Sequence, residues 1–427
     1  MPETPAWRTS PNLALNQLVA ERRAAGEDIV HLGFGESRLP AFGPLAEALA
    51  RGAHRNAYGP VAGSPDVRRA LAGYFERRGL PTTADQIVVG PGSKPLLMAL
   101  QHVLPGDVLL PRPAWNSYAP QARLAGRRAY GVPIPAVCGG VPDPVALRET
   151  VRAARASGGD PRTVILTLPD NPTGTLAPPE LVRELCAVAE ELDLVIVSDE
   201  IYRDIVHDPA TPFLSPAKVA PHRTVVTTGL SKSLALGGWR IGACRLPGDA
   251  WGERIRDGVV SVASEVWSTL AGPMQEVAAY AFDEPPEIRA RLAACARLHG
   301  VLAREVHRIV TAAGALCRPP TGGFYVYPDF EPLRERLATL GVTDSPSLQR
   351  HLLDAYGVLV LAGHHLGDDE GALRFKAATS MLYGDTAEEQ EEALASDDPL
   401  GLPHVASVLK HIDDAFTALR GQRRGRP

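Results

Sequence analysis

The sequence predicts an α/β fold, with a large domain built on a mostly parallel sheet sandwiched by helices and a smaller α+β domain. Short runs rich in Val, Ile and Leu alternate with helical segments from about residue 86 to residue 228, and this alternation changes after Pro285. Continuous apolar strands that alternate with helices are typical of a parallel sheet covered on both faces. A chain of 427 residues also favours two or three lobes over one small domain.

Six apolar runs are the expected strands of the large domain, at residues 87–89, 108–110, 128–132, 164–168, 194–198 and 224–228. The expected helices between them cover residues 95–104, a segment from 115, 142–156 and 179–192. Polar motifs follow four of the strands: G-P-G-S-K, P-D-N-P-T-G, D-E-I-Y and S-K. Because ligands of such sheets gather at the carboxyl ends of the strands, we expect these motifs to form one site.

The two ends of the chain are expected to form the smaller domain together. Ser10 and Pro11 begin a capped amphipathic helix, and a strand follows at residues 28–32. The C-terminal part predicts helices at 286–313, 345–356 and 405–419 and strands at 358–361 and 373–377, whereas the acidic residues 388–399 are expected to be a solvated loop. The predicted divisions are 1–45 (N-terminal segment joining the small domain), 46–285 (large domain) and 286–427 (small domain).

Composition limits the partners of the chain. The net charge is −5 and the pI about 6.2, so no global basic field favours nucleic acid or an anionic membrane. The five cysteines are scattered without metal-ligand spacing, and no run of 18 apolar residues occurs, so we expect no metal, no membrane span and a cytoplasmic protein. The basic C-terminal tail is expected to be a frayed terminus.

The stretch from residue 224 to residue 243 carries the first chemical hypothesis. Lys232 follows a β-branched strand in a small, mostly apolar setting, with Ser231 beside it and Arg240 eight positions later. An amine whose charge is easily shed, next to groups that can hold a phosphate, suits an enzyme that forms a Schiff base. The alternative from these residues alone is an ordinary surface lysine in a loop.

Several motifs in order add up to a family resemblance. N-P-T-G at 171–174, D-E-I-Y at 199–202, S-K at 231–232 with Arg240, and L-R-F-K at 373–376 resemble the class I/II aminotransferases. The resemblance extends from the N-terminal helix to Arg374. It implies the fold type I architecture with a seven-stranded sheet, pyridoxal 5′-phosphate (PLP) as cofactor, a homodimer, and transfer of an amino group between an α-amino acid and a 2-oxo acid.

The resemblance also implies roles for individual residues. Lys232 would form the Schiff base and move protons, Asp199 would keep the pyridine nitrogen protonated, and Tyr202 would donate to the 3′-oxygen of PLP. Three further sets are implied. The phosphate ligands are Gly92, Ser93 and Lys94 at a helix N-terminus, Ser231, Arg240, and Tyr58 from the other subunit. Trp115 would stack on the ring, and Asn171 would contact the 3′-oxygen. Gly35, Asn171 and Arg374 would bind the substrate carboxylate.

Three departures from the family pattern keep a second function open. Gly229 stands where many members have a hydroxyl, Ser37 and Arg38 follow Glu36 where proline is usual, and His364-His365 replace a P-G-x-x-F pattern. The alternative is a PLP-dependent cyclase, oxidase or β/γ-lyase that acts on an amino acid with the same cofactor site. A cofactor-free structural protein is disfavoured because Lys232, Asp199 and Arg374 are all present.

Overall fold

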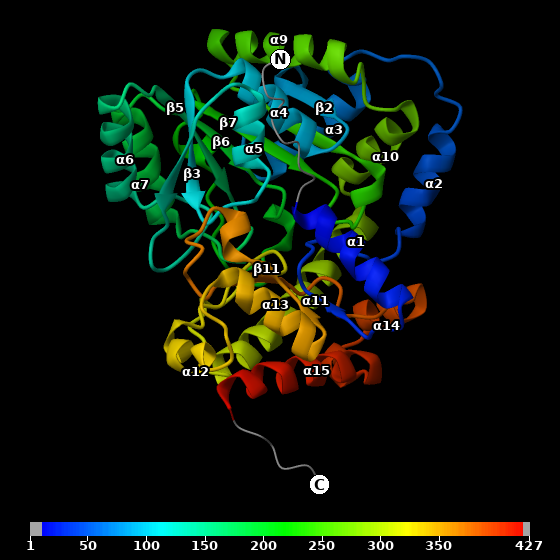
Figure 1. The fold of residues 1–427 in the computed structure, drawn as a ribbon. Helices are drawn as coiled ribbons and strands as arrows, with labels where there is room; N and C mark the ends of the chain where they lie inside the picture. The colour runs from blue at the N-terminus through cyan, green and yellow to red at the C-terminus, as the bar shows by residue number, and fades with distance from the viewer. Residues whose placement is uncertain (1–10, 422–427) are drawn as a thin grey trace, which may run out of the picture.

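A computed structural model describes residues 11–421 and shows two lobes (Figure 1). The large lobe contains a seven-stranded sheet in the order β2-β8-β7-β6-β5-β3-β4. Its strands are β2 (Ile87–Gly90), β3 (Asp107–Arg112), β4 (Ala129–Pro133), β5 (Pro161–Thr167), β6 (Val195–Asp199), β7 (Thr224–Gly229) and β8 (Gly242–Arg245). Strand β8 runs antiparallel to both neighbours and the other pairs are parallel, which confirms the predicted mostly parallel seven-stranded sheet.

Adjacent residues of each strand are buried on opposite faces of this sheet. In β7, Val225 packs in the cluster that includes α4 and α9, whereas Val226 packs in the cluster that includes α3 and α10. In β5, Ile165 faces the α4 side and Val164 faces α6 and α7. Burial on both faces explains why the strands are continuously apolar rather than alternating.

The helices of the large lobe cover both faces. Their bounds are α2 (Gly43–Gly52), α3 (Pro65–Arg77), α4 (Ser93–Val103), α5 (Tyr118–Leu124), α6 (Pro144–Ala156), α7 (Pro179–Glu191), α8 (Pro216–Val219), α9 (Ala250–Val266) and α10 (Gly272–Asp283). Helices α4, α6 and α7 occur close to where the sequence predicts helices, and Ser64 caps α3 through the backbone N–H of Val67. Strand β8 was not located from the sequence because Gly-Ala-Cys-Arg has little β-branched character.

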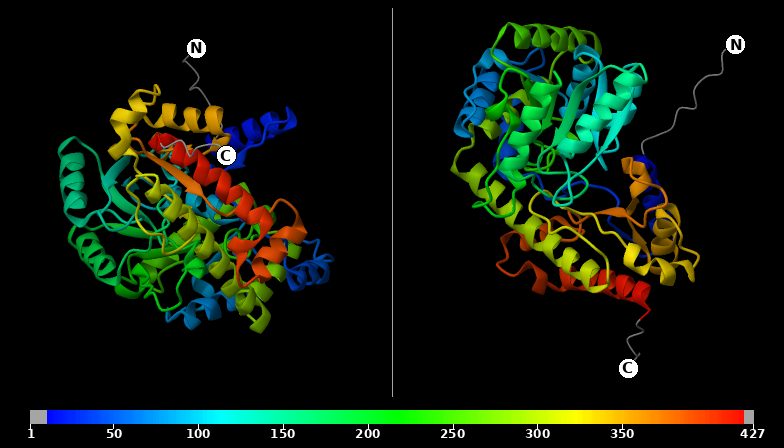
Figure 2. Two further views of the ribbon diagram at one scale, coloured as in Figure 1. Left: turned by 90° about the horizontal axis from the view of Figure 1, so that it is seen from below. Right: turned by 90° about the vertical axis from the view of Figure 1, so that its left-hand side faces the viewer.

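The small lobe combines the C-terminal elements with the N-terminal segment. Its helices are α11 (Pro286–Ala312), α12 (Arg334–Ala338), α13 (Ser345–Tyr356), α14 (Ala387–Ala395) and α15 (Pro403–Arg420), and its strands are β9 (Tyr325–Val326), β10 (Val358–Leu359), β11 (Leu361–Ala362) and β12 (Phe375–Ala378). Helix α1 (Pro11–Ala24) lies beside α13, and β1 (Val30–His31) pairs with β10 (Figures 1 and 2).

The division of the chain at residues 45 and 285 remains a proposal, and the packing of residues near these positions can be compared with it. Leu15 and Val19 of α1 pack against Leu353 and Leu359 of the small lobe. Leu45 of α2 belongs to a cluster of the large lobe, as does Ile288 in the first turn of α11, whereas α11 packs in the small lobe from Cys295 onward. Ser10 and the end of the basic tail lie outside the described residues.

The expectation of a solvated loop at residues 388–399 was wrong, because α14 occupies most of it. The Thr386 hydroxyl accepts the backbone N–H of Glu389, and the Glu389 carboxylate accepts the backbone N–H of Thr386 in a capping box. Ala393 and Leu394 bury one side of this helix in the small-lobe core. No helix within residues 11–421 has the length and apolar character needed to cross a membrane.

Candidate active site

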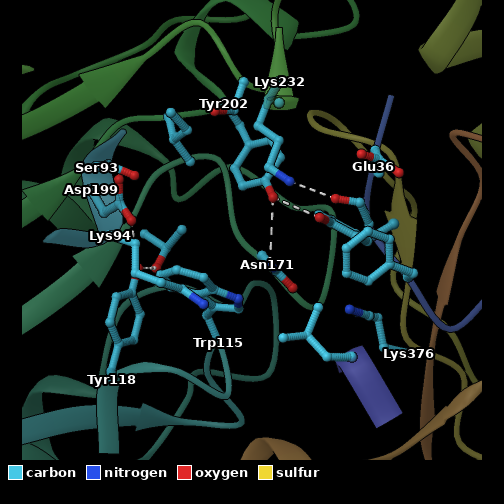
Figure 3. Close-up of a pocket in the computed structure, with 18 of the residues that line it drawn as sticks. Glu36, Ser93, Lys94, Trp115, Tyr118, Asn171, Asp199, Tyr202, Lys232 and Lys376 are labelled. Carbon is cyan, nitrogen blue, oxygen red and sulfur yellow. Dashed lines mark hydrogen bonds between the residues drawn. The ribbon is translucent and has the colours of Figure 1, made fainter. Parts of the chain in front are cut away.

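A cavity of about 440 Å³ lies where the large-lobe motifs meet the small lobe (Figure 3). Most of the predicted site residues line it: Gly35, Ser93, Lys94, Trp115, Asn171, Asp199, Tyr202, Ser231, Lys232 and Arg240. Asp199 ends β6, and Ser231 and Lys232 follow β7, so the cavity lies at the carboxyl ends of parallel strands.

Lys232 projects its amine into the middle of this cavity (Figure 3). Its Nζ donates a hydrogen bond of 2.5 Å to the backbone oxygen of Gly35 in the N-terminal segment. Burial lowers the pKa of Lys232 to about 8, and the neighbouring Arg240 and Lys94 charges also lower it, while Glu36 and Asp199 oppose them. The amine is therefore easier to deprotonate than an exposed lysine.

Asp199 is a buried carboxylate held by two hydroxyl donors. The Tyr118 O–H donates to Oδ2 at 2.8 Å, and the Thr227 O–H donates to Oδ1 at 3.0 Å. Burial raises the pKa of Asp199 to about 6, although these hydrogen bonds favour the ionised form. A positively charged ligand atom beside this carboxylate would remove the cost of burying its charge.

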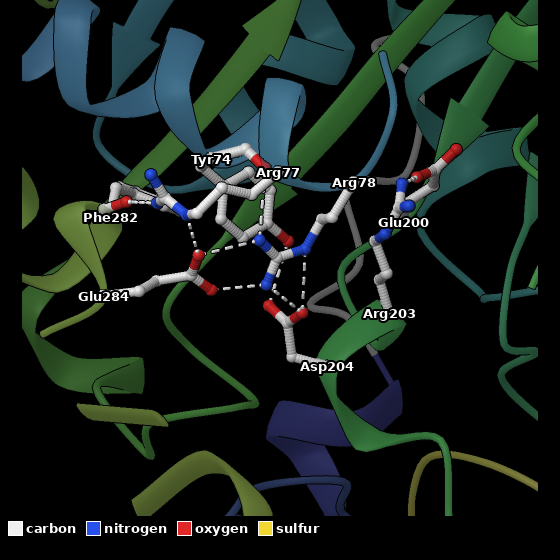
Figure 4. A network of polar contacts seen from close by, with 8 residues as sticks. All are labelled: Tyr74, Arg77, Arg78, Glu200, Arg203, Asp204, Phe282 and Glu284. Carbon is white, nitrogen blue, oxygen red and sulfur yellow. Dashed lines mark hydrogen bonds and ion pairs between the residues drawn. The ribbon is translucent and has the colours of Figure 1, made fainter. Parts of the chain in front are cut away.

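Ion pairs behind the cavity anchor the segment that carries Asp199 and Tyr202 (Figure 4). Arg203 pairs with Glu200 at 2.7 Å, and Arg78 of the large lobe pairs with Asp204 at 2.7 Å and with Glu284 at 2.5 Å. All five side chains are at least four-fifths buried, so the network fixes the backbone that follows β6.

Three polar side chains form a chain of contacts on the other side of Lys232. The hydroxyls of Tyr202 and Tyr325 are 2.6 Å apart, and Nδ2 of Asn171 lies 3.5 Å from the Tyr202 hydroxyl (Figure 3). Burial raises the pKa of both tyrosines far above the usual value, so they remain hydroxyl donors. Oδ1 of Asn171 is buried and has no hydrogen-bond partner within residues 11–421.

Glycines shape the loop between β2 and α4 at one end of the cavity. Gly92 has φ of +90°, and a Cβ there would lie 2.4 Å from Nη2 of Arg240. A Cβ on Gly242 in β8 would lie 2.4 Å from the backbone nitrogen of Ser93. Only glycine at both positions lets Arg240 and β8 approach the N-terminus of α4, where free N–H groups favour an anion.

Lys94 and Arg240 add positive charge at this end. Burial and the Arg240 charge lower the pKa of Lys94, and neither side chain pairs with a carboxylate in the part of the chain described here.

The departure from the family pattern at Gly229 has a steric reason, since a Cβ there would lie 2.6 Å from the backbone oxygen of Ile241. The backbone contact with the residue before β8 therefore excludes a hydroxyl side chain at position 229.

Trp115 lines the same cavity and packs edge-on against Tyr118, with ring centroids 5.3 Å apart. Lys94 Nζ lies 5.2 Å from the centroid of the Trp115 ring. Tyr118, Tyr325 and Lys376 line the cavity too but were not predicted as site residues. Lys376 belongs to the L-R-F-K motif, whereas Tyr118 and Tyr325 belong to P-R-P-A-W-N-S-Y at 111–118 and P-T-G-G-F-Y-V-Y-P at 320–328. Only the folded backbone shows which residues of these segments point inward.

Three predicted site residues do not line the cavity: Gly92, Arg374 and Tyr58. Arg374 lines a neighbouring pocket, where its Nε donates to Oδ2 of Asp329 at 2.8 Å and its Nη1 lies 3.4 Å from both oxygens of Asp368. Its role as a ligand of the substrate carboxylate stays a prediction. Tyr58 is 90% exposed and does not reach the cavity of its own chain.

The remaining departures from the family pattern have structural partners. The Ser37 hydroxyl lies 3.0 Å from the Tyr383 hydroxyl, which also accepts the backbone N–H of Arg38 at 2.9 Å. The Arg38 side chain pairs with Glu36 at 3.5 Å. His364 contacts the Ser345 hydroxyl through Nδ1 at 3.1 Å, and neither His364 nor His365 lines the cavity.

This set of groups fits PLP. The glycine loop, Lys94 and Arg240 suit a phosphate, and the buried Asp199 suits a protonated pyridine nitrogen. Trp115 offers a flat apolar face to a ring, and Nδ2 of Asn171 and the Tyr202 hydroxyl can donate hydrogen bonds to a phenolic oxygen. The amine of Lys232 lies between these groups (Figure 3).

Comparisons with known proteins agree with this site. Residues 27–388 match the model of the family "Aminotransferase class I and II". An aspartate/prephenate aminotransferase of Thermus thermophilus is 33% identical over 375 residues, which cover 80% of this chain and 89% of that protein. An aspartate/prephenate aminotransferase of Cereibacter sphaeroides is 33% identical over 374 residues, covering 84% and 90%.

Solved structures of aspartate aminotransferases have the same fold as this chain. The structure of the aspartate aminotransferase from Thermus thermophilus with maleate superimposes with a TM-score of 0.80, covers 97% of both chains and is 27% identical. The family match, these relatives and the sheet favour transamination over the alternative of a cyclase, oxidase or lyase. The chain belongs to the class I and II aminotransferases, the fold type I transaminases that use pyridoxal 5′-phosphate.

Proposed function

We propose that this aminotransferase uses Lys232 as its covalent and proton-transferring group, with an α-amino acid and a 2-oxo acid as the exchange partners. The observation that supports this most directly is the Lys232 amine, whose pKa is lowered to about 8 inside a cavity that also contains Asp199 and the phosphate-binding loop. A lysine that sheds its proton near neutral pH can act as a nucleophile and as a base.

The cofactor contacts would come from several elements of the large lobe. Gly92, Ser93, Lys94, Ser231 and Arg240 would hold the phosphate, and Asp199 would face the pyridine nitrogen. Tyr202 and Asn171 would donate to the 3′-oxygen, and Trp115 would cover the ring. When bound, PLP supplies an electron sink that stabilises negative charge developing at the Cα of the amino acid.

The residues of the chain divide the remaining work. Nζ of Lys232 would accept the Cα proton of the bound amino acid, because the amine lies in the cavity and its lowered pKa makes the free amine more accessible than in an exposed lysine. Tyr118 and Thr227 would keep Asp199 ionised and aligned through their hydrogen bonds. Tyr325 would fix the Tyr202 hydroxyl, which lies 2.6 Å away.

We propose an acidic amino acid, aspartate first, as the amino donor. Lys94, Arg240, Lys232 and Lys376 all line the cavity, against the two carboxylates of Glu36 and Asp199. A positive cavity favours a dicarboxylate over a neutral amino acid. The relatives named aspartate/prephenate aminotransferase point in the same direction.

We further propose a cytoplasmic homodimer in which Tyr58 reaches the phosphate of the partner. The support is that Tyr58 is 90% exposed in a single chain, although aromatic side chains are seldom left this open without a partner. All five cysteines are free, which suits a reducing compartment. Sedimentation would give the mass of the assembly, and Tyr58→Phe should weaken PLP retention only if the subunits pair as proposed.

A half-reaction assay tests the proposed function. Purified protein should bind PLP with a visible absorbance band, and aspartate without a 2-oxo acid should convert the cofactor to its amine form. Lys232→Ala should lose the borohydride-reducible link to the cofactor. A colourless wild-type protein that takes up no PLP would disprove the proposal, and release of ammonia or peroxide without the amine form would instead support the lyase or oxidase alternative.

A further inference from the structure

Asp170 is a buried carboxylate directly before Asn171, and it has no role in the site described above. The residue is 1% exposed and lies between the end of β5 and the N-P-T-G turn. The backbone N–H and the hydroxyl of Thr173 both donate to its Oδ2, at 3.0 and 2.6 Å. Its Oδ1 is buried and has no hydrogen-bond partner within residues 11–421. One oxygen therefore holds the turn, and the other is buried at a cost in stability.

No ion pair compensates the charge of Asp170 within residues 11–421. Burial raises the pKa of Asp170 to about 7, although the hydrogen bonds from Thr173 and the Arg318 charge act in the opposite direction. The Arg318 guanidinium donates instead to the backbone oxygens of Pro135 and Ala136. The hydrogen bonds from Thr173 are therefore the contacts that hold this carboxylate in place.

A neighbouring loop of the large lobe makes room for the carboxylate and is tied to it. A Cβ on Gly139 would collide with Oδ2 of Asp170, so only glycine fits at that position. The backbone N–H of Gly139 donates to the Thr175 hydroxyl at 2.8 Å, and this hydroxyl lies 2.7 Å from the Thr173 hydroxyl. A line of hydrogen bonds thus runs from the Gly139 backbone through two threonines to Asp170.

The N-P-T-G turn is built around this carboxylate. The backbone N–H of Asp170 donates to the Thr175 oxygen at 2.8 Å, and the backbone N–H of Gly174 donates to the Asp170 oxygen at 3.0 Å. Asn171 lines the cofactor cavity from this turn, and its Nδ2 lies 3.5 Å from the Tyr202 hydroxyl (Figure 3). The direction of the Asn171 side chain therefore depends on a turn that Asp170 closes.

The same turn holds the small-lobe segment that carries Tyr325. The backbone oxygen of Gly174 accepts the N–H groups of Thr321 and Gly322, at 2.8 and 3.0 Å. Gly174 has φ of +69°, and a Cβ there would collide with the backbone oxygen of Tyr325. The Tyr325 hydroxyl is in turn 2.6 Å from the Tyr202 hydroxyl. Both hydrogen-bonding neighbours of the Tyr202 hydroxyl within residues 11–421 thus come from segments that this turn positions.

We propose that Asp170 is a positioning residue that sets the two neighbours of the Tyr202 hydroxyl, Asn171 and Tyr325. This inference rests on the proposed contact of Tyr202 and Asn171 with the 3′-oxygen of PLP. Asp170 does not line the cavity, so it acts through the turn and not by touching the cofactor or the substrate. With the turn closed, both donors would meet the 3′-oxygen together, and with the turn loosened both would be displaced together.

Hydrogen exchange tests the first part of the proposal in the full-length protein, with and without PLP. Asp170→Ala removes both hydrogen bonds from Thr173 and should speed amide exchange about tenfold in residues 171–176 and in residues 321–325. Asp170→Asn keeps an oxygen that can accept from Thr173 and should stay within about threefold of wild type. Asp143→Ala is the matched control, because Asp143 also accepts two hydrogen bonds, from backbone N–H groups at the start of α6. D143A should change exchange in α6 alone.

The absorbance of bound PLP tests the second part. Hydrogen bonds to the 3′-oxygen make it a weaker base, so the visible band of PLP bound to Lys232 should titrate about one pH unit higher when both donors are displaced. D170A should show this change, and D170N and D143A should titrate within about 0.3 pH unit of wild type. Thr173→Val removes the hydroxyl on the other side of the contact. It should reproduce most of the effect, and D170A combined with it should add little.

The same measurements can overturn the inference. If D170A resembles D143A, with a lower melting temperature but unchanged exchange in residues 321–325 and an unchanged titration of PLP, then Asp170 only fills space. Faster exchange in residues 171–176 alone would overturn the link to Tyr325, and equal defects in D170N and D170A would overturn the role of the hydrogen bonds from Thr173.

Two further outcomes are also decisive. If wild-type protein takes up no PLP, the proposed function fails, while exchange in the protein without PLP still decides whether Asp170 holds both segments. If D170A does not fold, T173V carries the test, since it leaves the Asp170 carboxylate in place. Wild-type exchange and an unchanged PLP titration in T173V would then contradict the proposal.

Discussion

The two ends of the cavity are built in different ways. At the large-lobe end the loop from Gly92 to Lys94 uses backbone N–H groups, and glycines at 92 and 242 let three segments meet within contact distance. At the small-lobe end a single cationic side chain, Lys376, faces the cavity, and the neighbouring Arg374 is paired elsewhere. The first end is fixed by backbone geometry and the second by which side chain faces inward.

This difference in construction predicts different effects of substitution at the two ends. Cofactor anchoring needs a fixed backbone, because N–H groups must converge on one phosphate. At the small-lobe end the side chains that face the cavity matter instead, because two residues along a strand move a side chain by about 7 Å. We expect changes at the large-lobe end to affect the cofactor and changes at the small-lobe end to affect the substrate.

The largest effect is expected at Lys232, which lies between the two ends. Lys232→Ala should lower the transamination rate on the order of 1,000-fold, because the variant lacks the group that moves the Cα proton. Single-turnover kinetics with aspartate would measure it. Retention of the near-wild-type rate in K232A would exclude Lys232 as the base, and small primary amines added to the variant should restore part of the rate if it is.

Asp199 offers the next test, at the cofactor side. Asp199→Asn should lower kcat about 100-fold, since the amide cannot provide the charge that keeps the pyridine nitrogen protonated. Tyr118→Phe removes one hydrogen bond to the same carboxylate and should cost only about fivefold. The spectrum of bound PLP would report the change directly. Equal effects of the two substitutions would mean that the carboxylate matters for its hydrogen bond rather than its charge.

The pKa of Lys232 predicts how cofactor uptake depends on pH. Burial depresses this pKa to about 8, so the protonated amine predominates below that value and the reactive free amine above it. PLP uptake by apo-protein should therefore accelerate about tenfold per pH unit up to about 8 and then level off. Stopped-flow absorbance would follow it, with R374M as the control that keeps the profile. A flat profile would contradict the lowered pKa.

The smallest effects compare the two ends directly through one added methyl group. Gly92→Ala places a Cβ 2.4 Å from Arg240 at φ of +90° and should weaken PLP binding about five- to tenfold. Gly35→Ala places a Cβ 2.1 Å from the Tyr325 hydroxyl and should raise KM for the amino acid by a similar factor. PLP dissociation constants and KM values would test both. A change of PLP affinity in G35A would show that the two ends are coupled.

Much of this protein could be predicted from the sequence. Six sheet strands of the large lobe were located because residues buried on both faces are continuously apolar. The residues from Gly92 to Lys94, Asn171, Asp199, Tyr202 and Lys232 were identified from the motifs of the family resemblance. Each lies at or within a few residues of the end of a strand, so the local chain already places it at the sheet edge. These features depend on neighbours within a few residues.

Other features depended on contacts between distant segments. Strand β8 forms because Gly242 lets it pack against Ser93, and α14 forms a helix because its capping box and one apolar side meet the small-lobe core. Whether Arg374 or Lys376 faces the cofactor cavity was decided by the pairing of β12 with β9 and by the way the two lobes meet. The sequence places two cations on one strand face, and only tertiary packing determines which of them is left without a carboxylate, because the partners Asp329 and Asp368 are brought in by other parts of the chain.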